Sequence, residues 1–209
     1  MQHWLFLIVL TLCTVSGKSD DPSELNPSAA DVPSRGSAFS QNEYNQLLRA
    51  FHEPTLTNRK TGSRDVYRLS WMRSSEPYIV FRLEIAADGG SQLFVTKGSL
   101  NEDISKPALI TSKSRLKITR SATNNFLRLF AASSFLTRSS NDPHEQLVEL
   151  DGSEWVMEAS VESRYHVTTR SYPLPTESDP RNKSQEEIAL DTASLYLILL
   201  GRAANEDLY

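Results

Sequence analysis

Alternation of apolar and polar side chains is the feature that most constrains the fold of this chain. In residues 66–72, Tyr67, Leu69 and Trp71 alternate with polar neighbours, and residues 78–85 repeat the pattern. A period of two with one polar face is typical of half-buried antiparallel strands. Because short turn sequences join this run to the next ones, the sequence predicts a meander.

Helical periodicity appears on either side of these strands. A capping box at residues 40–43 opens one expected helix, which Pro54 ends, and a wide apolar stripe in residues 121–137 predicts another. A second capping box at residues 184–187 opens a third helix, with Gly201 as its expected C-cap. The pattern predicts an α+β fold: an antiparallel sheet of about six strands with two or three helices packed on one face.

The last hairpin is expected to form from residues 154–161 and 164–171. A shift of one residue turns every side chain to the other face of a sheet, so the two apolar rows share one core only for some loop lengths. A three-residue loop, 161–163, satisfies this condition and places Glu158 beside His166. The buried row expected from this register consists of Trp155, Met157, Tyr165 and Val167.

Glu158 and His166 are the nearest approach to a general acid/base pair in the sequence. The structural interpretation, which we favour over a catalytic one, is a cross-strand charge pair on a solvated face. Arg68, Arg82 and Arg170 are the candidate ligand-binding residues, because they lie with the polar side chains of their strands. Such arginines either bind acids within the fold or present a surface to a carboxylate-bearing partner.

Other kinds of site find little support. The sequence has no G-x-S-x-G nucleophile motif and no glycine-rich phosphate loop, and His52, His144 and His166 share no metal-ligand spacing. No cofactor or metal is therefore expected. Basic residues are scattered and the net charge is −4, which argues against a nucleic-acid partner. Trp71 and Trp155 lie on apolar rows and are expected in the core.

The N-terminus predicts export. Residues 4–13 are apolar except for Thr11, and residues 15–17 offer small residues to a signal peptidase. A retained anchor and a lipoprotein attached through Cys13 are the alternatives. We expect a signal peptide at 1–17, a disordered spacer at 18–38, a single domain at 39–203 and a tail at 204–209. The mature chain, without a transmembrane span, is then periplasmic or secreted.

Three motifs resemble a family of uncharacterised bacterial secreted or envelope proteins. They are R-x-x-W-x-R from Arg68, D-G-x-x-W-x-x-E from Asp151 and Y-H-V-x-x-R-x-x-P from Tyr165. The resemblance covers residues 66–200, but residues 98–103 depart from the Gly-Gly-Tyr-x-Pro-Gly segment of the family. It implies an envelope-associated domain and supplies no catalytic residues. The expected function is a non-catalytic binding module for an envelope or secreted protein; the alternative is a hydrolase using Glu158 and His166.

Overall fold

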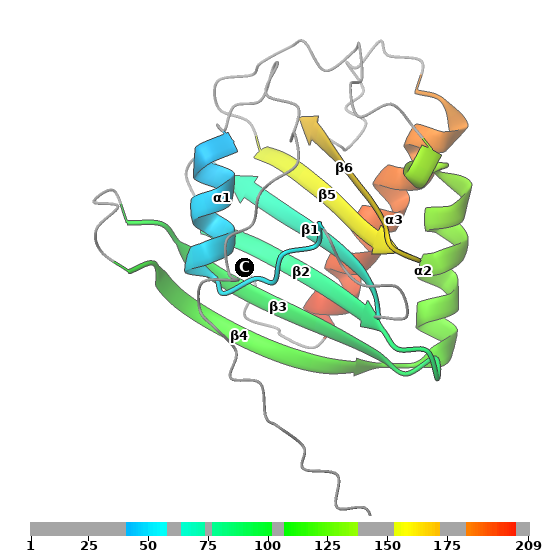
Figure 1. The fold of residues 1–209 in the computed structure, drawn as a ribbon, viewed down its shortest axis with the longest axis horizontal. Helices are drawn as coiled ribbons and strands as arrows, with labels where there is room; N and C mark the ends of the chain where they lie inside the picture. Colours follow the sequence, from blue (N-terminus) through cyan, green and yellow to red (C-terminus); the bar gives the residue numbers. More distant parts are fainter. Residues whose placement is uncertain are drawn as a thin grey trace, which may run out of the picture.

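One antiparallel sheet of six strands organises the fold, in the order β4-β3-β2-β1-β5-β6 (Figure 1). The first four strands form the expected meander, and the last hairpin adds beside β1. The strands are β1 (Asp65–Arg73), β2 (Tyr78–Ile85), β3 (Ser91–Ser99), β4 (Leu109–Ile118), β5 (Ser153–Val161) and β6 (Arg164–Ser171). The six-stranded antiparallel sheet and the α+β class are therefore confirmed.

This computed structural model describes residues 41–57, 64–73, 77–101, 107–137, 153–171 and 183–203. The expected signal peptide, spacer and tail lie outside the described residues, as do Ser40 of the first capping box, Cys13, His144, Asp151 and Pro173. The helical elements are α1 (Gln41–Ala50), α2 (Arg120–Ala132), the short 3-10 helix η2 (Phe135–Thr137) and α3 (Gln185–Arg202). The capping box that opens α3 is confirmed, because Ser184 and Glu187 exchange both bonds.

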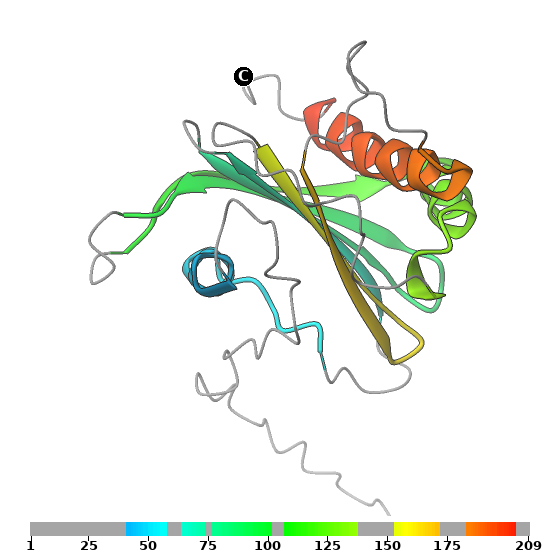
Figure 2. The same ribbon diagram turned by 90° about the horizontal axis from the view of Figure 1, so that it is seen from above.

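Helices cover both faces of the sheet, not one face as predicted. Figure 2 shows α2 and α3 on one side and α1 on the other. The reason lies in the central strands: β1 buries five consecutive residues, Val66 to Ser70, so neither face of the strand is open to solvent. Leu69 belongs to the core beneath α2 and α3, whereas Met72 packs with Leu47 of α1 and with Phe51, which directly follows the helix. These are called the α2–α3 core and the α1 core below.

The register predicted for the last hairpin is wrong by one residue. The turn has two residues, Glu162 and Ser163, both in the left-handed region with φ of 49° and 65°. Glu158 therefore pairs with Val167, and His166 pairs with Ala159. The prediction assumed that one face of the hairpin meets solvent. Because both faces are covered, Trp155 and Met157 pack in the α2–α3 core while Val167 packs in the α1 core.

Gly201 is a packing residue of α3 and not its C-cap. The helix continues to Arg202, and Ala203 caps it. A Cβ atom placed on Gly201 would lie 2.6 Å from Cε1 of Phe81 in β2, so only glycine lets the helix approach the sheet this closely. Expected core residue Trp155 is buried, and Trp71 is partly buried against the same core with its ring 6.1 Å from that of Trp155.

Candidate functional site

A buried polar network centred on Glu158 lies between α1 and the sheet. The hydroxyls of Tyr44, from α1, and Tyr165, from β6, both donate to its carboxylate, the latter over 2.7 Å. Arg68 of β1, adjacent to Glu158 across the strand pair, donates from Nε over 2.6 Å. Glu158 is 3% exposed and Arg68 is 1% exposed. Every acceptor site of this carboxylate therefore faces the protein interior.

The network continues from Arg68 toward the end of α1. Nη1 of Arg68 donates to the carbonyl oxygen of Pro54 over 2.8 Å and lies 3.6 Å from the carboxylate of Glu53. Arg82 of β2 donates to the same Glu53 over 2.9 Å and also pairs with Glu84. The segment that follows α1 is thus fastened to β1 and β2 by alternating charges.

Burial and neighbouring charges hold the protonation states of this network. Burial raises the pKa of Tyr44 well above its ordinary value, and the negative charge of Glu158 raises it further. Tyr165 has a raised pKa for the same two reasons. Burial alone would lower the pKa of Arg68, but the carboxylates of Glu158 and Glu53 outweigh it and the net shift is upward. The tyrosines stay neutral donors and the arginine stays charged, as a structural network requires.

A cleft of about 290 Å³ opens beside the outer end of this network. We call it the basic cleft. The register aligns Arg82, Phe94 and Arg115 side by side on β2, β3 and β4. The guanidinium of Arg82 lies 4.2 Å from the Phe94 ring centroid and that of Arg115 lies 5.4 Å from it. Lys113 lines the cleft two residues before Arg115 on β4, opposite Thr96.

The charge of the basic cleft is opposite to that of the whole chain. Among the described residues, its lining includes three cationic side chains, Arg82, Lys113 and Arg115, and one carboxylate, Glu53, which already binds two arginines. The side chain of Lys113 makes no hydrogen bond or ion pair within the described part of the chain. The chain as a whole carries a net charge of −4. A local excess of positive charge in a concave surface attracts anions.

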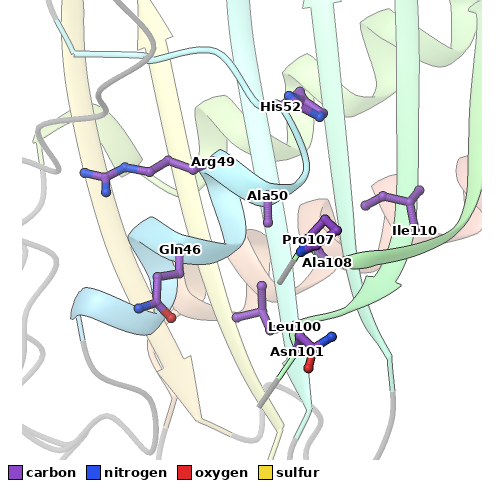
Figure 3. Close-up of a pocket in the computed structure, with 9 residues that line it drawn as sticks. All are labelled: Gln46, Arg49, Ala50, His52, Leu100, Asn101, Pro107, Ala108 and Ile110. Atoms are coloured by element: carbon purple, nitrogen blue, oxygen red, sulfur yellow. The ribbon is translucent and has the colours of Figure 1, made fainter. Parts of the chain in front are cut away.

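A second cavity, of about 500 Å³, lies where the end of α1 faces the β3–β4 hairpin (Figure 3). We call it the aliphatic cavity, because Ala50, Leu100, Ala108 and Ile110 supply much of its wall. His52, in the turn after α1, lines both this cavity and the basic cleft. The lining residues are Gln46, Arg49, Ala50, His52, Leu100, Asn101, Pro107, Ala108 and Ile110.

The structure divides the residues proposed from sequence between the two faces. Arg68, Arg82 and Glu158 meet on the α1 side, but His166 and Arg170 lie on the α2–α3 side. The His166 ring packs edge-on against Phe135, with centroids 4.8 Å apart. Nη1 of Arg170 donates to Glu187 of α3 over 3.2 Å. The predicted contact of Glu158 with His166 is therefore wrong. Glu158 pairs with Val167, and His166, the next residue along β6, points to the opposite face of the sheet.

Two further findings bear on the kind of site. Within the described ranges, no group of three or more His, Cys, Asp or Glu side chains is placed to hold a metal ion. None of the described helices is long and apolar enough to cross a membrane.

Sequence reasoning missed Phe94, Lys113, Arg115 and His52. Lys113, Arg115 and Lys117 do alternate along β4, and this signal marks one polar face of a strand. It does not reveal that the face lies beside Arg82, because that depends on the pairing of three strands.

Comparisons with known proteins add no relative. No protein-family model matches the chain, and no curated protein sequence is similar to it at a significant level. The resemblance to bacterial envelope proteins thus remains an expectation from the sequence.

Proposed function

We propose that this chain is a non-catalytic binding domain, exported to the bacterial envelope or beyond it, whose basic cleft holds an anionic group of its partner. The observation that carries the proposal is the cluster of Arg82, Lys113 and Arg115 around Phe94 in an otherwise acidic protein. Export follows from the apolar leader at residues 4–13. A carboxylate-bearing envelope or secreted protein has the matching chemistry.

The cleft is organised for binding before any ligand arrives. Arg82 is held by Glu53 and Glu84, and its guanidinium stacks over the Phe94 ring. Arg115 is held by Gln92, to whose side-chain oxygen it donates over 2.9 Å and 2.6 Å. Fixed guanidinium groups bind carboxylates or phosphates with little loss of side-chain entropy. Lys113 adds a point charge that is not neutralised within the described part of the chain.

The hydrolase alternative loses its geometric support. A general acid and base must both reach one reacting group, yet Glu158 and His166 lie on opposite faces of the sheet. Glu158 is moreover enclosed by Arg68, Tyr44 and Tyr165. We therefore assign this carboxylate to the buried structural network beneath α1 and not to chemistry on a substrate.

Binding of inorganic phosphate, used as a simple anion probe, tests the basic cleft. A ligand that binds only the folded state increases the free energy of unfolding, by about 2.7 kcal/mol at a concentration of 100 times Kd. The melting temperature rises as a result. At constant ionic strength, we expect phosphate to stabilise the wild-type chain and Arg128→Glu but not Lys113→Glu. Arg128 is the matched control, because it is exposed on α2 and the charge change is the same. Equal stabilisation of both variants would contradict the proposal.

Export is tested separately by intact-mass measurement of the protein from the envelope fraction. We expect a chain that begins at Lys18, since residues 15–17 have the small side chains that signal peptidase requires. A mass that retains residues 1–17 would refute cleavage. A lipid adduct on Cys13 would establish the lipoprotein alternative instead.

A further inference from the structure

The two hollows on the α1 side adjoin and differ in chemistry. The basic cleft presents Arg82, Lys113 and Arg115, whereas the aliphatic cavity has an apolar wall beside four polar side chains. His52 lines both, so the two hollows are neighbours on either side of this residue. We propose that the ligand is a small amphipathic anion, with a carboxylate or phosphate head in the basic cleft and an aliphatic chain in the aliphatic cavity. This inference rests on the proposed function of the basic cleft.

The sizes of the hollows suit a small molecule. Pockets that bind small ligands have volumes of about 300–1,000 Å³ and are mostly apolar, with a few polar groups that fix orientation. The aliphatic cavity, about 500 Å³, falls within this range by itself. Its apolar wall is formed by Ala50, Leu100, Pro107, Ala108 and Ile110, none of them aromatic. A flexible alkyl chain packs against such branched and small side chains without requiring hydrogen-bond partners.

Charge fixes the orientation of the ligand. None of the described residues that line the aliphatic cavity carries a carboxylate, and the one described carboxylate of the basic cleft, Glu53, pairs with Arg68 and Arg82. An anionic head therefore meets attraction at Lys113 and Arg115. The lining of the aliphatic cavity includes a single cation, Arg49, beside Leu100, Ala108 and Ile110, whereas the basic cleft includes three. The head is therefore attracted more strongly to the basic cleft.

His52 occupies the junction in a conformation that favours glycine. Its φ is 56°, and the bonds His52 N–H to Arg49 O (3.0 Å) and Glu53 N–H to Leu48 O (2.8 Å) form a Schellman ending of α1. Glycine is usual at this position because the left-handed conformation strains a residue with a Cβ. Strained residues cluster at ligand sites. The His52 imidazole lines both hollows. We infer that histidine replaces glycine here because its side chain contacts the ligand.

A chain-length series measured by titration calorimetry tests the inference. The probes are octanoate, decanoate and dodecanoate below their micelle concentrations, with 1-decanol as the neutral probe and inorganic phosphate as the head alone. Each methylene buried in an apolar site contributes about 0.8 kcal/mol, so affinity is expected to rise roughly fourfold per added methylene. Decanol should bind much more weakly than decanoate. Equal binding of the three carboxylates, or of decanol and decanoate, would overturn the inference.

Two matched tryptophan variants locate the chain. Ala108→Trp fills the aliphatic cavity and is expected to abolish the dependence on chain length while leaving phosphate binding intact. Leu109→Trp is the control, because Leu109 adjoins Ala108 in the sequence but is 67% exposed and is not among the residues that line the cavity. If Ala108→Trp leaves the series unchanged, the chain lies elsewhere and the inference is wrong. If phosphate binds but no chain-length effect exists, only the inference fails; if phosphate does not bind, the proposed function fails too.

Discussion

The two faces of the sheet differ in the side chains that they bury. On the α2–α3 side, aromatic and aliphatic side chains from β1, β2, β3 and β5 meet both helices in one continuous core, closed by Phe126 and Phe130. On the α1 side, a smaller apolar core shares its space with buried charges, of which Arg68 is 1% exposed. Burying polar groups costs free energy. The domain tolerates this cost on the α1 side because the α2–α3 core stabilises the same sheet.

The part of the sheet that α1 leaves uncovered contains the basic cleft, the binding site that we propose. No residue of β4 is fully buried, and Figure 2 shows α1 lying over only part of the sheet. Lys113 and Arg115 therefore reach solvent beside the covered charges of Arg82 and Glu53. The contrast indicates that stability resides mainly in the α2–α3 core, whereas the binding that we propose is placed at the border of the α1 core. The variants below separate these two contributions.

The largest loss of stability is expected for Trp155→Ala in the α2–α3 core. Trp155 is 3% exposed, and removing a buried aromatic side chain costs about 3–5 kcal/mol. Chemical denaturation measures the change in unfolding free energy. Arg164→Ala is the control, since its side chain is 57% exposed on the same hairpin and a change below about 0.5 kcal/mol is expected. A harmless Trp155→Ala would refute the assignment of stability to this face.

Arg68→Met tests whether the charges beneath α1 are coupled. Removing one partner of a buried ion pair costs about 3–5 kcal/mol, because Glu158 would stay buried without its cation. The double variant Arg68→Met with Glu158→Leu removes both charges and is expected to recover part of this loss. Denaturation of the two variants gives the comparison. A double variant no more stable than Arg68→Met would show that the pair is not coupled.

Tyr165→Phe tests the same network through its response to alkali. Tyr165 and Tyr44 have raised pKa values in the folded chain, whereas unfolded tyrosines lose their protons near pH 10. The unfolded state therefore binds fewer protons above that pH, and stability falls as pH rises. Tyr165→Phe should cost about 1.5–3 kcal/mol at neutral pH, through the lost bond to Glu158, and weaken the alkaline dependence. An unchanged alkaline slope would argue against the buried hydroxyl.

His52→Gly should give the smallest effect on stability, with the opposite sign. Glycine relieves the left-handed strain at the end of α1, and a gain of about 1 kcal/mol or less is expected. Decanoate affinity should fall, because the imidazole at the junction of the two hollows is lost. Thermal melts and calorimetry report the two quantities. Loss of stability together with unchanged affinity would assign His52 a purely structural role.

The sequence predicted those elements whose signals are local. Alternation identified β1 and β2, and the capping box at Ser184 placed the start of α3. The predicted hairpin register was wrong because it required one face of the hairpin to lie in water. In the structure, Glu158 and Val167 face α1. Arg68 and Arg82 were recognised as candidates, but the full burial of Arg68 and the slight exposure of Arg82 depend on where α1 docks.

The remaining parts of the site depend on distant pairing. Phe94 and Arg115 meet Arg82 only because β2, β3 and β4 pair in one register. His52 joins them because α1 ends over that part of the sheet. Nothing in the local sequence states this order of strands, so the basic cleft was not predictable from single positions.

Mapping of amide chemical shifts during titration with phosphate and then decanoate tests the central claim most directly. We expect both probes to shift amides around Phe94, Thr96 and Lys113 in the basic cleft, and decanoate also to shift those of Ala50, His52 and Ile110 around the aliphatic cavity. Amides of α2 and α3 should stay unchanged, because the α2–α3 core is closed. Shifts concentrated near Arg170 and Lys183 on the opposite face, or spread evenly over the domain, would contradict the account.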